Sequence, residues 1–121
     1  MLMEGEIVIY HNGVCSKCKG ALELLQEMGV PHRVRYYIYE PLNRDEISAL
    51  LKKLGVRASE LIRKGEPLYL EKYGDKELSD EECVRALLEN PELMQRPIVE
   101  KGNKAIIARP PERVLEMLGR T

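Results

Sequence analysis

The chain has 121 residues, which is the length of one ordinary domain. Hydrophobic residues make up 44% and charged residues 32% of it, a balance typical of globular proteins and not of disordered ones. The formal net charge of −1 argues against a broad attraction to nucleic acid or to an anionic membrane. We therefore expect a single globular domain over residues 1–121 that binds no nucleic acid directly and no membrane.

The N-terminal segment carries Glu4 and Glu6 where a secretory signal would be basic, and the apolar run at 7–10 is too short to span a bilayer. The chain has three cysteines, an odd number that does not suggest a secreted disulfide framework. We expect a cytoplasmic protein. In that reducing compartment a Cys-x-x-Cys pair is more often catalytic, redox-active or metal-binding.

The first third of the chain predicts a strand, a helix and a second strand. The β-branched segment 6–10 reads as a strand, and a polar loop with one glycine follows it at 11–14. A helix opens at Cys15-Ser16-Lys17-Cys18, with apolar side chains on one face, and Gly29 ends it. The second strand is expected at about 33–39.

The middle third predicts helices. Asn43 is suited to cap a helix that Gly55 ends, and a shorter helix is expected over 57–63. Ser79 forms a capping box with Glu82 at the start of a further helix. That helix should end at Asn90-Pro91.

The last third predicts a hairpin and a helix. Strands at 97–99 and 105–108 flank a turn with the hairpin signal Gly-Asn, and Pro110-Pro111 starts the final helix. The order β-α-β, helices, β-β-α predicts an α/β, thioredoxin-like fold. It has a mixed four-stranded sheet, with the helical region inserted between strands 2 and 3.

Cys15 carries the strongest chemical signal, because it lies where a strand ends and a helix begins. The unpaired N–H groups of a helix start favour an anion, so the pKa of the thiol should fall and the thiolate should be reactive. Lys17, Lys19 and His11 lie nearby in sequence and are expected to add positive charge. The alternative is an inert buried cysteine.

Cys18 lies one helical turn after Cys15, and two interpretations of it stay open. It can act as a resolving thiol that closes a reversible disulfide with Cys15, or it can pack in the core in line with Leu22 and Leu25. A zinc site would need ligands beyond this pair, and the spacing of the remaining candidates matches no zinc pattern. We expect no metal, and we expect Cys83 to be a packing residue.

Three arginines, Arg63, Arg96 and Arg109, lie at the ends of predicted elements. Arginine suits the bidentate binding of tetrahedral oxyanions. Taken singly, each is as well explained by a solvated surface position or an ion pair, and sequence spacing does not show that they converge on Cys15.

Five segments in order along nearly the whole chain resemble the glutaredoxin-coupled arsenate reductases. The segment HNGVCSKCK at 11–19 resembles their nucleophile loop, and YEPL at 39–42, followed by a helix, also fits. The segments ELIRK at 60–64, MQRPIV at 94–99 and ARPPE at 108–112 resemble their three arginine motifs.

The resemblance implies roles for these residues. Cys15 would be the nucleophile, His11 would tune its thiol, and Arg63, Arg96 and Arg109 would hold the oxyanion. Pro97 would be the cis proline that faces the active cysteine. The substrate would be arsenate or a similar oxyanion, and glutathione would be the co-substrate. Glutaredoxin or thioredoxin would be the reductant, with no bound cofactor.

Cys18 departs from the family, whose members commonly have serine there, and it leaves the need for an external thiol open. A Cys-x-x-Cys switch also occurs in the related Spx-type regulators, which bind RNA polymerase. They match the Arg109 segment poorly, so the third arginine favours the enzyme. The alternatives are a general thiol reductase of glutathionylated substrates and a non-enzymatic Spx-like redox regulator.

Overall fold

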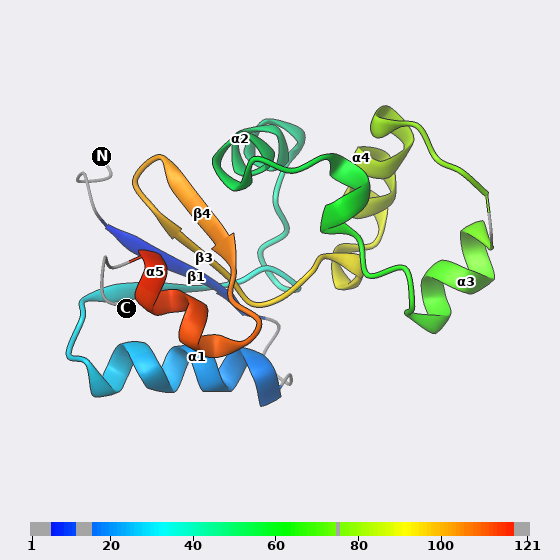
Figure 1. Ribbon diagram of the computed structural model, residues 1–121. Coiled ribbons are helices and arrows are strands. Elements are labelled where there is room, and N and C mark those ends of the chain that lie inside the picture. Colours follow the sequence, from blue (N-terminus) through cyan, green and yellow to red (C-terminus); the bar gives the residue numbers. More distant parts are fainter. Residues whose placement is uncertain (1–5, 12–15, 75, 118–121) are drawn as a thin grey trace. The chain divides into compact units, whose positions relative to one another are not determined.

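The computed structural model describes residues 6–11, 16–74 and 76–117 (Figure 1). The chain forms two compact units. The sheet unit combines residues 1–40 with 96–121, and the helical unit is the continuous segment 41–95. The helical unit thus lies between the second and third strands of the sequence, as predicted.

The sheet unit contains a four-stranded sheet in the order β2-β1-β3-β4. Strands β1 and β2 are parallel, whereas β3 is antiparallel to both β1 and β4. This mixed sheet, with a helix between its parallel strands and a hairpin after the insertion, confirms the predicted thioredoxin-like α/β fold. The strands are β1 (Ile7–His11), β2 (His32–Tyr36), β3 (Ile98–Lys101) and β4 (Lys104–Ile107).

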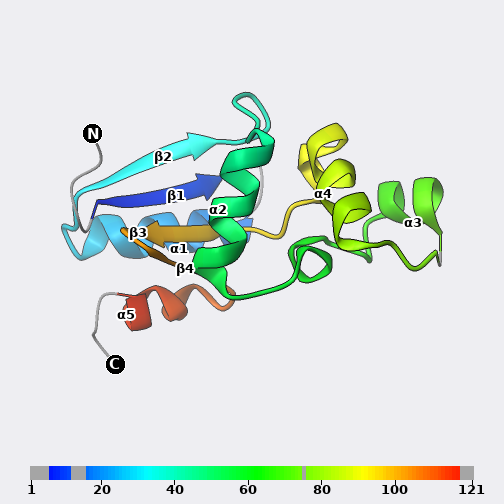
Figure 2. The same cartoon turned by 90° about the horizontal axis from the view of Figure 1, so that it is seen from above.

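Helices α1 (Ser16–Glu27) and α5 (Val114–Met117) belong to the same unit and lie beside the sheet in both views (Figures 1 and 2). Leu25 of α1 and Val114 of α5 are fully buried against strand residues such as Ile9. Alternate residues of β1 and β3 thus supply one sheet face for these helices, as the period of two requires. The buried core of this unit consists of Ile7, Ile9, Ala21, Leu25, Val99, Ala108 and Val114.

Strand β2 ends earlier than the sequence predicts. We expected it to reach residue 39, but it stops at Tyr36, and the Tyr39 N–H donates to the Tyr36 carbonyl at 3.0 Å in a turn. Tyr36 is paired with His11, the last residue of β1. The partner strand ends there, so residues 37–39 have no described ladder to extend despite their β-forming side chains.

The helical unit contains α2 (Arg44–Leu54), α3 (Pro67–Tyr73) and α4 (Asp80–Glu89). Both predicted N-caps are confirmed: Asn43 accepts from the Glu46 N–H, Ser79 accepts from the Glu82 N–H, and each glutamate returns a bond to the cap backbone. Gly55 ends α2 in the left-handed conformation at φ 70°.

Two parts of this unit differ from prediction. The helix expected over 57–63 is only a 3₁₀ turn, η1 (Ala58–Leu61), because Ile62 leaves it to form a β-bridge with Met94. Helix α3 was not predicted, although Pro67 stands at its first position, where proline is favoured. A second 3₁₀ turn, η2 (Pro91–Leu93), follows α4.

The hairpin and the C-terminal region agree closely with prediction. Gly102 takes φ 60° in the turn between β3 and β4, and η3 (Pro111–Arg113) leads into α5. Within the described residues, no helix combines the length and the apolar character that crossing a membrane requires.

Candidate active site

The register of the β3–β4 hairpin determines what lies at one end of the sheet. Its last strand pair at this end is Ile98 with Ile107. The ladder continues one residue further, because the Ala108 N–H donates to the Pro97 carbonyl at 2.9 Å. Pro97 is fully buried at this point.

Arg96 precedes Pro97 and Arg109 follows Ala108 in the sequence. Both arginines are half-buried, and each precedes a cis peptide bond, to Pro97 and to Pro110. The cis state of the Arg96–Pro97 bond is the one that the resemblance implied for Pro97. Both arginines thus adjoin the last backbone hydrogen bond of the hairpin, and the Arg109 N–H donates to the Ile107 carbonyl at 2.9 Å in a turn.

His11 lies at the same end of the sheet. It is one residue past the pair formed by Tyr10 and Ile98, so the β1–β3 register sets it opposite Pro97. Its ring is buried, with its centroid 5.7 Å from that of Tyr36 on β2.

Burial lowers the pKa of the His11 imidazole below its ordinary value of 6.5, since desolvation disfavours the charged ring. The ring is therefore mostly neutral at neutral pH. The role of His11 toward the Cys15 thiol remains a prediction.

Cys15 and the side chain of Cys18 lie outside the described residues. Strand β1 ends at His11 and α1 begins at Ser16, so in the sequence Cys15 falls between a strand end and a helix start, as predicted. The acidity of the Cys15 thiol and the Cys15–Cys18 disulfide remain predictions.

Arg63 belongs to the helical unit. Its N–H donates to the Leu93 carbonyl at 2.7 Å, directly beside the Ile62–Met94 bridge. The Gln95 side chain donates to the Ile62 carbonyl at 3.3 Å, which closes this short ladder. The backbone of Arg63 is thus anchored to the segment that leads to Arg96.

The Arg63 guanidinium forms an ion pair with Glu66, three residues further along. Both groups border a cavity of about 470 Å³ that Lys64, Gly65 and Gln95 also line. Arg96 and Arg109 lie together in the sheet unit, whereas Arg63 lies in the other unit. One anion site shared by all three arginines therefore remains a prediction.

Sequence reasoning missed two partners of the predicted site residues. Glu66 was not singled out, although its i,i+3 spacing from Arg63 is a usable signal for an ion pair. Tyr36 beside His11 had no local signal, because the two meet only through the β1–β2 register.

The two histidines weighed for zinc lie apart. His32 pairs with Ile7, at the opposite end of β1 from His11, and its Nδ1 lies 2.7 Å from the Val30 carbonyl oxygen. Cys83 lies in the helical unit and is 1% exposed, which confirms that it is a packing residue. Burial raises the pKa of its thiol.

Residues 10–117 match the ArsC family. This chain belongs to the ArsC family. The match covers both units and all three arginine motifs, so the family resemblance seen in the sequence is confirmed.

Several similar proteins align with almost the whole chain. The uncharacterized protein YfgD of Escherichia coli is 45% identical over 119 residues, which is 97% of this chain and 100% of the relative. The arsenate reductase of Haemophilus influenzae is 38% identical, covering 93% of this chain and 98% of that protein. The solved arsenate reductase from Vibrio cholerae superposes with a TM-score of 0.86 at 38% identity, covering 94% of this chain and 98% of that one.

Proposed function

We propose that this ArsC-family protein reduces arsenate to arsenite in the cytoplasm through a covalent adduct on Cys15. The observation that carries the proposal is that Arg96 and Arg109 adjoin the Pro97–Ala108 hydrogen bond, the last backbone bond of the hairpin. They lie at the end of the sheet where β1 leads into the segment that contains Cys15. Whole-chain similarity to proteins named arsenate reductase supports the choice of oxyanion.

The first step is attack of the Cys15 thiolate on arsenic. A sulfur–arsenic bond forms, and one arsenate oxygen leaves as water after protonation. The substrate is an anion with tetrahedral oxygens, which guanidinium groups bind in bidentate fashion. Arg96, Arg109 and Arg63 hold those oxygens, together with the N–H groups at the start of α1.

His11 tunes the thiol in this proposal. A neutral imidazole can accept the thiol proton, whereas a protonated one cannot. The lowered pKa of the buried His11 ring keeps it in the neutral form at neutral pH. Its place opposite Pro97, at the end of β1, is consistent with that role.

The second step transfers two electrons to arsenic. Glutathione attacks the adduct, and arsenic(V) leaves as arsenite, arsenic(III). The two sulfurs each lose one electron and end as a Cys15–glutathione disulfide. Glutaredoxin then reduces this disulfide and restores the thiol. Cys18 can take the place of glutathione, in which case a Cys15–Cys18 disulfide forms and thioredoxin restores the pair.

The test is arsenite production from arsenate, with the glutathione–glutaredoxin and thioredoxin systems compared. Cys15→Ser should abolish turnover, because a hydroxyl is a far weaker nucleophile than a thiolate near neutral pH. Cys83→Ala is the matched control, since it removes a thiol from the helical unit and should keep turnover. Residual turnover near the original level in Cys15→Ser would exclude Cys15 as the nucleophile.

Cys18→Ser separates the two electron routes. Increased dependence on glutathione in this variant, with the chemical step intact, identifies Cys18 as the resolving thiol. Reduction of glutathionylated substrates without arsenate turnover would favour a general thiol reductase instead. RNA polymerase binding without any turnover would favour a redox regulator.

A further inference from the structure

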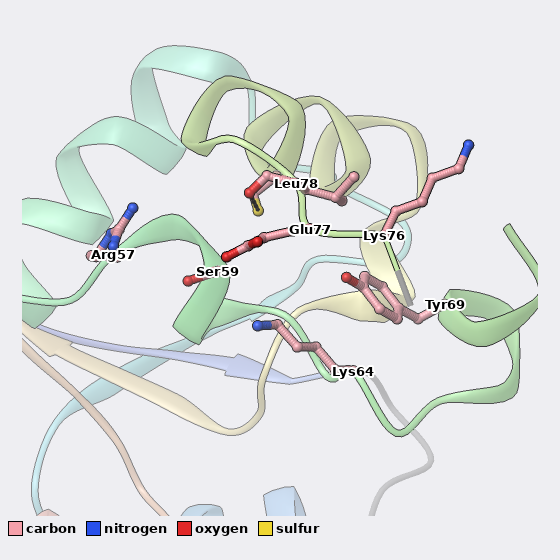
Figure 3. Close-up of a pocket in the computed structure, with 8 residues that line it drawn as sticks. Arg57, Ser59, Lys64, Tyr69, Lys76, Glu77 and Leu78 are labelled. Carbon is pink, nitrogen blue, oxygen red and sulfur yellow. Dashed lines mark hydrogen bonds between the residues drawn. The ribbon is translucent and has the colours of Figure 1, made fainter. Parts of the chain in front are cut away.

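The helical unit contains a second cavity, distinct from the one at Arg63. It has a volume of about 130 Å³ and lies between η1, the start of α3 and the segment that leads into α4 (Figure 3). Leu78 is its only aliphatic side chain among the described lining residues. These residues are Arg57, Ser59, Lys64, Tyr69, Lys76, Glu77, Leu78 and Cys83.

Tyr69 contributes its hydroxyl to this cavity. The residue as a whole is 5% exposed, so its ring is held in place by the surrounding side chains. In Figure 3 the hydroxyl points into the cavity. Burial raises the pKa of Tyr69, so the group stays protonated and acts as a donor. A hydroxyl that faces a cavity can donate to the carboxylate of a bound ligand.

Lys64 and Glu77 bring opposite charges to the same space. Figure 3 shows the Lys64 ammonium and the Glu77 carboxylate both reaching toward the cavity. Neither forms an ion pair within the described part of the chain, with the other or with a third residue. Two opposite charges that border one cavity and do not pair with each other leave both available to a ligand.

The remaining basic groups contribute less. Arg57 is paired with the Asp80 carboxylate at 3.3 Å, and the Lys76 side chain extends away from the cavity in Figure 3. The cavity therefore offers one cation and one hydroxyl donor on one side and one carboxylate acceptor on the other. The Glu77 carboxylate would repel a ligand with only negative groups, and the Lys64 ammonium would repel a ligand with only positive groups.

We propose that this cavity binds a small zwitterion of the α-amino acid class. The ligand carboxylate accepts from the Lys64 ammonium and the Tyr69 hydroxyl, and its ammonium donates to the Glu77 carboxylate. Cys83 bounds the cavity as a buried wall residue, and its thiol donates to the Leu78 carbonyl at 3.9 Å. The site takes no part in the arsenate reaction, and its existence does not depend on that function.

The experiment titrates the full chain with L-serine, followed by calorimetry and by the backbone amide NMR signals of Ser59, Tyr69 and Cys83. We expect saturable binding that moves these signals. Acetate lacks the ammonium and ethylammonium lacks the carboxylate, so each should bind at least several-fold more weakly than L-serine.

Two variants locate the site. Lys64→Met should raise the dissociation constant about tenfold or more, because a charged partner is lost. Tyr69→Phe removes one oxygen and should raise it by about threefold to tenfold. Lys52→Met, at an exposed lysine on α2 outside the cavity, is the matched control and should leave binding unchanged. Circular dichroism of each variant checks that it remains folded.

Four results would overturn the proposal. One is the absence of saturable binding by L-serine. Another is an unchanged dissociation constant in folded Tyr69→Phe. The third is a set of shifted signals centred on Arg63, Gly65 and Gln95, which would assign binding to the neighbouring cavity, since Lys64 lines both. Acetate binding as tightly as L-serine would likewise refute the zwitterion class.

Discussion

The sheet unit and the helical unit hold their candidate anion-binding arginines in different ways. Arg96 and Arg109 adjoin Pro97 and Ala108, whose backbone hydrogen bond is the last one of the β3–β4 hairpin. Arg63 is anchored by one β-bridge, and its guanidinium is already paired with Glu66. An incoming oxyanion must compete with this carboxylate at Arg63, so the two units should contribute unequally to binding.

The units also differ in how they are assembled. The sheet unit joins two segments that are separated by the whole helical unit, and its β1–β3 ladder pairs Ile7 with Lys101. The helical unit is continuous, and capping boxes within it satisfy the starts of α2 and α4. Short-range sequence signals therefore predict much of the helical unit, whereas the sheet unit depends on long-range strand pairing.

The largest expected effect tests whether the three arginines contribute unequally to oxyanion binding. Arg96→Lys and Arg109→Lys should each lower kcat/KM for arsenate by about 10²–10³-fold, because lysine cannot replace a bidentate guanidinium. Arg63→Lys should cost less, since the Arg63 guanidinium is shared with Glu66. Steady-state kinetics with glutathione and glutaredoxin measures this.

Arg44→Lys serves as the control for these arginine substitutions. Arg44 is exposed and pairs with Glu81 at 2.8 Å in the helical unit, so its replacement should leave kcat/KM nearly unchanged. If Arg63→Lys causes the greatest loss of the three, the proposed division between the units is wrong.

The second expected effect is a loss of stability when a buried core residue of either unit is truncated. Leu25 in the sheet unit and Leu61 in the helical unit are both fully buried, so Leu25→Ala and Leu61→Ala should each lower the free energy of unfolding by about 2–5 kcal/mol. Leu70→Ala is the control, because Leu70 is 56% exposed and should change stability by only about 0.5 kcal/mol.

Urea unfolding followed by circular dichroism and by amide exchange compares the two units. A single domain requires one transition that both core substitutions shift together. Two transitions, each shifted by only one of the substitutions, would show that the units unfold separately and would refute the single-domain expectation.

The third effect tests the local signals of the helical unit. Ser79→Ala and Asn43→Ala each remove a side-chain acceptor at a helix start and should cost about 1 kcal/mol of stability. Ser48→Ala, at an exposed position within α2, is the matched control and should cost nothing. Equal unfolding midpoints for Ser79→Ala and Ser48→Ala would mean that the cap contributes nothing measurable.

The smallest expected effect is the pH dependence from His11 in the sheet unit. Its folded-state pKa lies below the unfolded value near 6.5, so the unfolded chain binds a proton more readily. The contribution of the neutral ring to stability is complete above pH 6.5. It is lost as the pH falls through 6.5 toward the lower folded pKa.

His11→Gln should flatten the loss of stability between pH 7 and pH 5, as measured by urea midpoints at several pH values. Above pH 7.5 the slope of stability against pH should be the same in both proteins. An unaltered acid-side slope in the variant would place the pH dependence elsewhere.

Features that rest on short-range hydrogen bonds were predicted more accurately than features that rest on long-range strand pairing. The helices capped by Asn43 and Ser79 and the hairpin around Gly102 were predicted, because each rests on hydrogen bonds between residues a few positions apart. The end of β2 was predicted wrongly, since a strand ends where its partner ends. Helix α3 was missed because its tyrosine-containing segment has no strong local signal apart from Pro67.

The sequence by itself determined the order of the strands, the fold class, the family and the identity of the candidate nucleophile. These follow from side-chain periodicity, capping and motif order, which are all properties of the linear chain. Only the tertiary structure decided that Arg96 and Arg109 adjoin one end of the β3–β4 hairpin, that His11 is buried with a lowered pKa, and that Arg63 pairs with Glu66. Register, desolvation and side-chain pairing depend on which segments pack together, and no short stretch of sequence records that.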